Sequence, residues 1–257
     1  MKPYALFIDI DNTLTAADHK IPRRNINAIN EARRIGHKVF INTGRSLGNI
    51  PPVIFDQLEF DGVLSGNGTM ITIGGKTVFS EFMPDDICMK LARYFFENEH
   101  LWAAFEGEKR SYSIPGRPRK LTSLETPVKS LEDFFEKSAD DNIQVIAGSK
   151  ETDPAFLESI KEEITYFRFD RYYDIVSHGN NKSNSMIKVL EMLGIPRERS
   201  VAFGDGDNDM NMLRSAGTGV AVANACEELI KAADLVTLPN YEGGVGSAIE
   251  ELLLRRG

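Results

Sequence analysis

The 257-residue sequence has little cysteine, a single tryptophan and no long uninterrupted hydrophobic run. Its two cysteines, Cys88 and Cys226, lie far apart, which excludes a dense disulfide framework and predicts reduced thiols. No apolar stretch is long enough to span a bilayer. The apolar run near the amino terminus is short and is interrupted by Asp9, so we do not expect a signal peptide. These absences predict a cytoplasmic protein without a membrane partner.

Positive charge is also scarce. The chain carries 30 Lys and Arg against 38 Asp and Glu, a net charge of −8, which argues against nucleic acid as the main partner. Local cations or backbone N–H groups can still bind a small anion such as phosphate. With 42% hydrophobic residues, the chain can bury a full core in one large domain or two smaller ones. Composition leaves the oligomeric state open.

Strands and helices are predicted to alternate in two separated parts of the chain. In the first part we expect strands at 4–8, 38–41 and 62–65, helices at 23–35 and 47–57, and a hairpin at 70–79. In the last part we expect helices at 183–193, 210–215, 225–233 and 245–254, and strands at 201–203, 219–222 and 235–238. This alternation predicts an α/β fold with a doubly wound, Rossmann-like parallel sheet.

The middle of the chain is rich in aromatic residues and lacks this rhythm. Its patterns predict helices at 85–98, 130–137 and 153–163, and strands at 101–106, 110–114, 143–147, 164–169 and 172–177. Hairpins and helices with their own aromatic residues can form a separate core. We therefore predict an α+β domain at 83–178, inserted into a core domain made of 1–82 and 179–257.

The stretch that ends the first strand is the most informative. Side chains two residues apart on a strand point to the same side, so Asp9 and Asp11 can share one site. Two carboxylates repel each other unless a cation or proton separates them, and ligands of open α/β sheets bind at the carboxyl ends of the strands. A polar turn explains Asp11 and Asn12 but leaves Asp9, within an apolar run, unexplained. We interpret the pair as functional.

Two other strand ends, at 42–46 and 204–209, also carry polar, glycine-containing sequences. Because carboxyl ends of parallel strands share one edge, all three stretches can converge. Asp205, Asp207 and Asp209 begin like an EF-hand calcium loop, but the glycine and final glutamate of that motif are absent, so we exclude it. Helix capping accounts for Asp207. Asp205 and Asp209 favour an oxygen-ligated cation, and Mg²⁺ suits such ligands.

Phosphate-binding groups are predicted along the same edge. Thr43-Gly44-Arg45 can offer a hydroxyl and backbone N–H groups to phosphate oxygens. Lys182 lies at the start of an expected helix, where a cation is unfavourable, and it can supply the counter-charge that an acidic cluster needs to receive phosphate. Each signal is weak alone, because loop lysines are usually solvated and Thr-Gly occurs in many turns.

Together these stretches carry a resemblance. Asp9-Ile10-Asp11-Asn12-Thr13, Thr43-Gly44-Arg45, Lys182 and Gly204-Asp205-Gly206-Asp207-Asn208-Asp209 resemble, in order and spacing, the four motifs of the haloacid dehalogenase-like (HAD) phosphatase superfamily. The insertion after the third strand, with its αββαβαββ order, is similar to the Cof-type subfamily with a type IIB cap. Two positions depart from the family pattern: Asn12 stands where glycine is usual, and Ser183-Asn184 follow Lys182 where glycine is common.

The resemblance implies a role for each matching residue. Asp9 would be the nucleophile that forms an aspartyl-phosphate, and Asp11 the general acid and then base. Phosphate binding is implied for four residues: Thr43, Gly44, Lys182 and Asn208. Metal binding is implied for the Asp9 carboxylate, the Asp11 backbone carbonyl and Asp205, with Asp209 and Asn208 supporting them.

The resulting hypothesis is a Mg²⁺-dependent phosphatase for a small phosphorylated metabolite, with a sugar phosphate as the leading candidate. A phosphomutase would use the same aspartates but return the phosphoryl group to a sugar. A non-enzymatic phospho-acceptor or binding protein is the alternative from another class, and the large insertion counts against it. Arg117, Arg119 and Lys120 form a basic stretch that we interpret as a solvated loop rather than a substrate contact.

Overall fold

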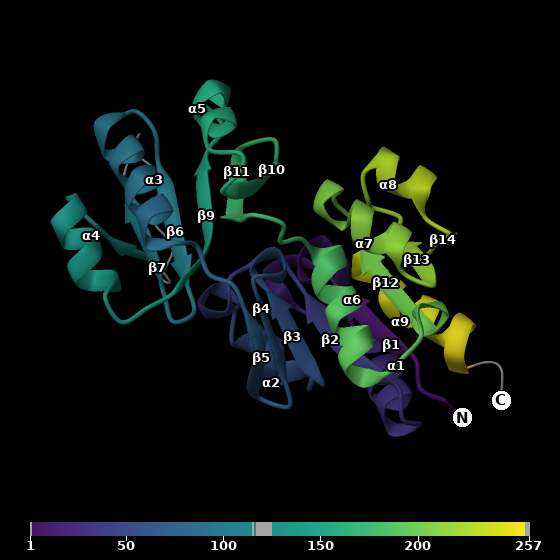
Figure 1. Ribbon diagram of the computed structural model, residues 1–257. Helices are drawn as coiled ribbons and strands as arrows, with labels where there is room; N and C mark the ends of the chain where they lie inside the picture. Colours follow the sequence, from purple (N-terminus) through teal and green to yellow (C-terminus); the bar gives the residue numbers. More distant parts are fainter. Residues whose placement is uncertain (1, 115, 117–124, 255–257) are drawn as a thin grey trace.

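The computed structural model describes residues 2–114, 116 and 125–254, so Arg117, Arg119 and Lys120 lie outside the described residues. Within them the strands form two sheets, the larger in the purple, blue and yellow-green parts of Figure 1 and the smaller in the teal part. The α/β prediction for the larger sheet is confirmed. No helix of these residues is both long and apolar enough to cross a membrane.

The larger sheet has the order β14-β13-β12-β1-β2-β3-β4-β5. Its strands are β1 (Ala5–Ile8), β2 (Lys38–Asn42), β3 (Gly62–Ser65), β4 (Met70–Ile73), β5 (Lys76–Ser80), β12 (Ser200–Gly204), β13 (Thr218–Ala221) and β14 (Leu235–Val236). The six strands from β14 to β3 are parallel, and the predicted hairpin, β4 and β5, continues the sheet antiparallel. β1 is buried along its whole length at the centre.

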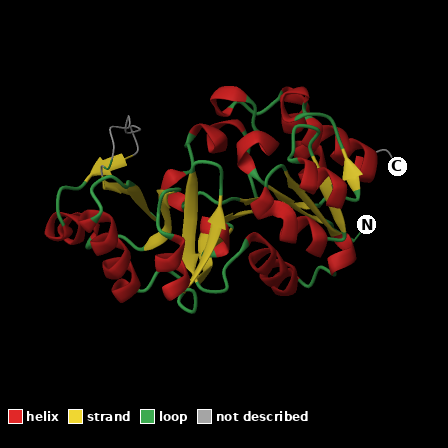
Figure 2. Cartoon of the chain, turned by 90° about the horizontal axis from the view of Figure 1, so that it is seen from above, coloured by secondary structure: helices red, strands yellow, loops and turns green. Residues whose placement is uncertain are grey.

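Helices cover both faces of this sheet, as a doubly wound fold requires (Figure 1, Figure 2). One face packs on α1 (Arg23–Arg34), α2 (Val53–Gln57) and α9 (Gly244–Ile249), and the other on α6 (Lys182–Leu193), α7 (Met210–Ser215) and α8 (Glu227–Ala232). Alternate residues of β1 enter different cores: Leu6 and Ile8 face α1, whereas Ala5 and Phe7 face α6. Each face of the strand therefore needs an apolar side chain.

The smaller sheet has the order β10-β11-β9-β6-β7-β8. Its strands are β6 (Ala103–Gly107), β7 (Ser111–Ile114), β8 (Glu125–Pro127), β9 (Ile143–Ser149), β10 (Ile164–Arg168) and β11 (Tyr172–Ser177), and its helices are α3 (Asp85–Glu97), α4 (Leu131–Ser138) and α5 (Pro154–Ser159). The helices and one sheet face share an aromatic core that includes Phe95, Phe105, Tyr112 and Phe134. The other face is turned toward the larger sheet.

Several predicted elements need correction. The helix expected at 47–57 is a short 3-10 turn at Leu47–Asn49 followed by α2, because Pro51 and Pro52 interrupt helical hydrogen bonding. β8 was not predicted, and α5 is shorter than the expected 153–163. The last expected helix, 245–254, changes at Glu250 to a wider π-helical turn.

Candidate active site

The centre of the site is a buried ion pair at the end of β1. The backbone N–H of Asp9 donates to Phe203 O of β12 at 3.1 Å, which fixes the residue at the sheet edge. Lys182 Nζ lies 2.7 Å from Asp9 Oδ1 and 2.6 Å from Asp209 Oδ1, and its side chain is 1% exposed. Asn181 caps α6 by accepting from Asn184 N at 2.8 Å, so Lys182 is the first helical residue. One ammonium thus connects two strand ends.

The loop after β12 is built around Asp209. Its Oδ2 accepts from the backbone N–H groups of Asp205 and Gly206, each at 3.1 Å. A Cβ at residue 204 would lie 2.4 Å from Asp209 Cβ, so only glycine allows this close approach. Asp205 Oδ1 accepts from Thr13 Oγ1 at 2.7 Å. With Lys182 on its other oxygen, Asp209 acts mainly as a support that positions its neighbours.

The acidic cluster has more negative charge than its single lysine balances. Oxygens of Asp9, Asp205 and Asp209 lie within 4.8 Å of one another. Burial raises the pKa of Asp9 well above its usual value against the pull of Lys182, and Asp209, Asp205 and Asp11 add to the rise. Burial and the charge of Asp209 raise the pKa of Asp205 to about 6. Hard oxygen donors with surplus negative charge suit a divalent cation, so the residues present fit Mg²⁺.

Lys182 keeps its charge in this setting. Burial alone would lower the pKa of its ammonium, but the adjacent carboxylates of Asp209 and Asp9 outweigh that effect and raise it.

Asp11 faces the same space but has a different partner. The guanidinium of Arg45 binds its carboxylate through two nitrogens, Nε at 2.6 Å from Oδ2 and Nη2 at 2.9 Å from Oδ1. Arg45 Nη1 also donates to Asn49 O at 3.1 Å, which holds the guanidinium in place. Asn12, which follows Asp11, has φ +58°, a left-handed conformation that asparagine tolerates.

The loop after β2 supplies Thr43 and Gly44, both lining the site. Thr43 N donates to Leu64 O at 2.9 Å and Asn67 N donates to Thr43 O at 3.0 Å, so neighbouring strand ends hold the loop. A Cβ at residue 44 would lie 3.3 Å from Asn67 Nδ2, so glycine leaves room there. Asn208 reaches the same point, with Nδ2 3.5 Å from Asn67 Oδ1.

A cavity of about 600 Å³ opens between the two sheets. From the larger sheet's side it is lined by Asp9, Asp11, Asn12, Thr43, Gly44, Arg45, Asn49, Asp205, Gly206 and Asn208, and from the smaller sheet's side by Trp102, Ala104, Glu106, Glu125, Ala147, Phe169, Tyr172 and Asp174. Most of the sequence-predicted site residues therefore surround one space, whereas Lys182 and Asp209 lie buried beneath it.

Sequence reasoning did not identify the cavity residues of the smaller sheet. Asp174 gave the clearest missed signal, because it interrupts the run Tyr172-Tyr173-Asp174-Ile175-Val176 as Asp9 interrupts its own apolar strand. Glu106 at the end of β6 carried no comparable signal.

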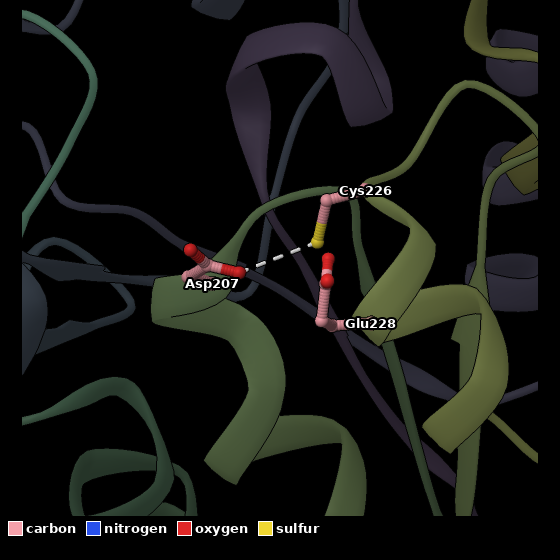
Figure 3. Close-up of side chains that lie close together, drawn as sticks. All are labelled: Asp207, Cys226 and Glu228. Atoms are coloured by element: carbon pink, nitrogen blue, oxygen red, sulfur yellow. Dashed lines mark hydrogen bonds between the residues drawn. The ribbon is translucent and has the colours of Figure 1, made fainter.

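A second group of possible metal-binding side chains, Asp207, Cys226 and Glu228, lies beside the loop after β12 (Figure 3). Cys226 Sγ is 3.4 Å from Asp207 Oδ1, and both acids are exposed. Because these acids are solvated and Cys226 serves as the residue before α8, we assign the group no role.

Comparison with known proteins agrees with this geometry. A family model described as haloacid dehalogenase-like hydrolase matches residues 6–249. The 5-amino-6-(5-phospho-D-ribitylamino)uracil phosphatase YitU of Bacillus subtilis (strain 168) is 26% identical over 281 residues, 97% of each chain. A phosphoglycolate phosphatase of Methanosarcina acetivorans is 28% identical over 253 residues, 98% of this chain and 97% of its own.

Among solved structures, the HAD subclass IIB sugar phosphatase BT4131 is similar with a TM-score of 0.80 and 28% identity. The match covers 96% of this chain and 98% of that protein. The chain therefore belongs to the haloacid dehalogenase-like hydrolase family, and within it is a phosphatase.

Proposed function

We propose that the protein is a Mg²⁺-dependent phosphatase that hydrolyses a small phosphorylated metabolite, most suitably a sugar phosphate, through an aspartyl-phosphate on Asp9. The observation that carries the proposal is the buried Asp9–Lys182–Asp209 group at the floor of a cavity that two sheets enclose. The names of YitU and BT4131, which include a phosphoribityl compound and a sugar phosphatase, support the substrate class.

In the proposed reaction Lys182 fixes Asp9 through Oδ1, while Oδ2 has no hydrogen bond among the described residues and attacks phosphorus. The ester P–O bond breaks as the Asp11 carboxyl, protonated at the start of the reaction, gives its proton to the leaving alcohol. Asp11 then takes a proton from the water that hydrolyses the aspartyl-phosphate. Arg45 holds the Asp11 carboxyl group through two nitrogens and so fixes its position for both proton transfers.

Binding of the phosphoryl group is assigned to the Thr43 hydroxyl, the backbone at Gly44, Lys182 and Asn208. Asp9, the Asp11 backbone carbonyl and Asp205 would hold Mg²⁺, with Asp209 behind them. When bound, Mg²⁺ supplies positive charge that offsets the negative charge of the phosphoryl oxygens.

We further propose that residues 1–82 and 179–257 form the catalytic domain and that 83–178 form a cap that excludes water and selects the leaving group. The two free, well-separated cysteines are compatible with the reducing cytoplasm, where we place the enzyme.

The proposal is tested by phosphate release from a panel of phosphomonoesters, with Mg²⁺ and with EDTA. Wild type should release phosphate only with Mg²⁺, and Asp9→Asn should lower kcat by about 10³-fold or more because the nucleophile is lost. Asp56→Asn, the same change at an exposed position of α2, should match wild type. Conversion to an isomeric sugar phosphate without free phosphate would make the protein a mutase, and a stable phospho-protein without turnover would make it an acceptor.

A further inference from the structure

Of the three acids of the smaller sheet that line the cavity, Glu125 accepts from Ser113 Oγ at 2.8 Å. The other two have no part in the chemistry proposed above. Glu106 lies on β6 and Asp174 on β11. Their strand neighbours Phe105 and Tyr173 point into the aromatic core, so the period-2 alternation turns both acids to the opposite, open face. Core packing therefore does not explain them.

Asp174 is 8% exposed, which is deep for a carboxylate. Among the described residues its carboxylate accepts only one hydrogen bond, a long one from Asn67 Nδ2, 3.4 Å from Oδ2. Burial, and then the nearby charge of Glu106, raise the pKa of Asp174 to about 8. The group lacks the donors that a buried carboxylate usually has in a structural role.

Glu106 is half-buried, and burial raises the pKa of its carboxyl as well. Its Oε2 accepts from Ser46 N at 3.4 Å, which places it at the boundary between the two sheets. Arg45 is the one cation among the described residues that line the cavity, and Asp11 already holds it through two nitrogens. The two acids thus face the cavity without a cation of their own.

The surroundings of these acids leave room for a polar organic group. Ala104 and Ala147 have small side chains on the same open face. The rings of Phe169 and Tyr172 stack 4.7 Å apart at the cavity margin. Apolar walls with a few convergent polar groups are typical of small-molecule sites.

We propose that Glu106 and Asp174 bind hydroxyl or ammonium groups of the leaving alcohol, so that the enzyme selects phosphate esters of polyols and amino sugars over esters with a second anion. The inference rests on the proposed function, which defines the leaving group. A hydroxyl or ammonium can donate to the oxygens of both acids, whereas a carboxylate in its place has no proton to donate and meets the negative charge of whichever acid is ionised.

The test compares kcat/KM for two open-chain esters that differ only at the far end, sorbitol 6-phosphate and 6-phosphogluconate. Wild type should prefer sorbitol 6-phosphate by about tenfold or more. Glucosamine 6-phosphate should be at least as good as glucose 6-phosphate. At pH 9, above the pKa of about 8 of Asp174, Glu106→Gln and Asp174→Asn should each reduce the sorbitol preference by about threefold or more, because each then removes a negative charge without changing shape.

Glu97→Gln, an identical change on the exposed side of α3, should keep the wild-type preference. The inference is overturned if wild type hydrolyses 6-phosphogluconate or phosphoglycolate as well as sorbitol 6-phosphate, or if neither variant alters the ratio. Asp9-dependent hydrolysis of p-nitrophenyl phosphate distinguishes a failure of this inference from a failure of the proposed function. If this hydrolysis is seen but the preference for sorbitol 6-phosphate is not as expected, only this inference is wrong. If no ester is hydrolysed, the proposed function is wrong as well.

Discussion

The two sides of the cavity treat their acids differently. On the larger sheet, Asp9 and Asp209 share Lys182, and Asp209 also accepts two backbone N–H groups. On the smaller sheet, the carboxylate of Asp174 accepts one long hydrogen bond among the described residues. Charges that a fold neutralises internally can hold a fixed geometry, whereas charges left without partners depend on what binds. We infer that one side performs a constant reaction and the other chooses its substrate.

The two sheets also differ in how many of their faces are covered by helices. Helices cover the larger sheet on both faces, so its central strands are apolar throughout. Helices cover only one face of the smaller sheet, and the alternate residues of β6 and β11 are free to carry polar groups. An open face is therefore where variation in polar residues has the least effect on folding.

Removal of Lys182, the lysine that Asp9 and Asp209 share, should have the largest effect on stability. Lys182→Met leaves Asp9 and Asp209 buried without their cation, and we expect the free energy of unfolding to fall by about 3–5 kcal/mol. Urea denaturation without Mg²⁺ measures this loss.

The matched control is Lys231→Met, which breaks an exposed pair with Glu227 and should cost far less. The double variant Lys182→Met/Asp209→Asn should regain part of the lost stability, because it removes one of the two buried carboxylates that Lys182→Met leaves without a cation. A cost for Lys182→Met no greater than that of the control would contradict the comparison.

A change at Asp174 should have an effect on stability that depends on pH. Its folded pKa, about 8, exceeds its ordinary value of 3.8, so between these values the folded protein holds a proton that the unfolded chain releases. The stability from this group is complete below the lower value and is lost as pH rises toward the upper one. Between about pH 5 and pH 8, the unfolding free energy of wild type should fall more steeply than that of Asp174→Asn, by up to about 1.4 kcal/mol per pH unit.

Because Asp9, Asp205 and Glu106 titrate in both proteins, the difference between the two pH curves reports on Asp174 and its interaction with Glu106. Parallel curves would mean that Asp174 is ionised in the folded protein at neutral pH.

The smallest effects should come from two helix caps. Asn181 caps α6, which carries Lys182, and Ser130 caps α4 by accepting from Asp133 N at 3.1 Å. Asn181→Ala and Ser130→Ala should each cost about 1 kcal/mol of stability. Only Asn181→Ala should also lower kcat, because it loosens the turn that positions Lys182. An equal loss of kcat in both variants would contradict the prediction that only the cap of α6 affects catalysis.

The sequence was sufficient where a local pattern has one structural meaning. Alternating strands and helices predicted the doubly wound sheet, and the rule that parallel strands share a carboxyl edge predicted that Asp9, Thr43 and Asp205 would lie near one another. The failures were also local: the prolines at 51 and 52 outweighed an apolar helical pattern, and β8 was too short to stand out.

What the sequence determined by itself was therefore the core fold and the set of polar residues at its edge, since strand direction and residue spacing impose both. Only the tertiary structure decided that Lys182 joins Asp9, 173 residues away, to Asp209, and that Glu106 and Asp174 complete the cavity from a separate sheet. These contacts depend on how two sheets meet. Side-chain packing and burial set that relation, and no period in the sequence encodes it.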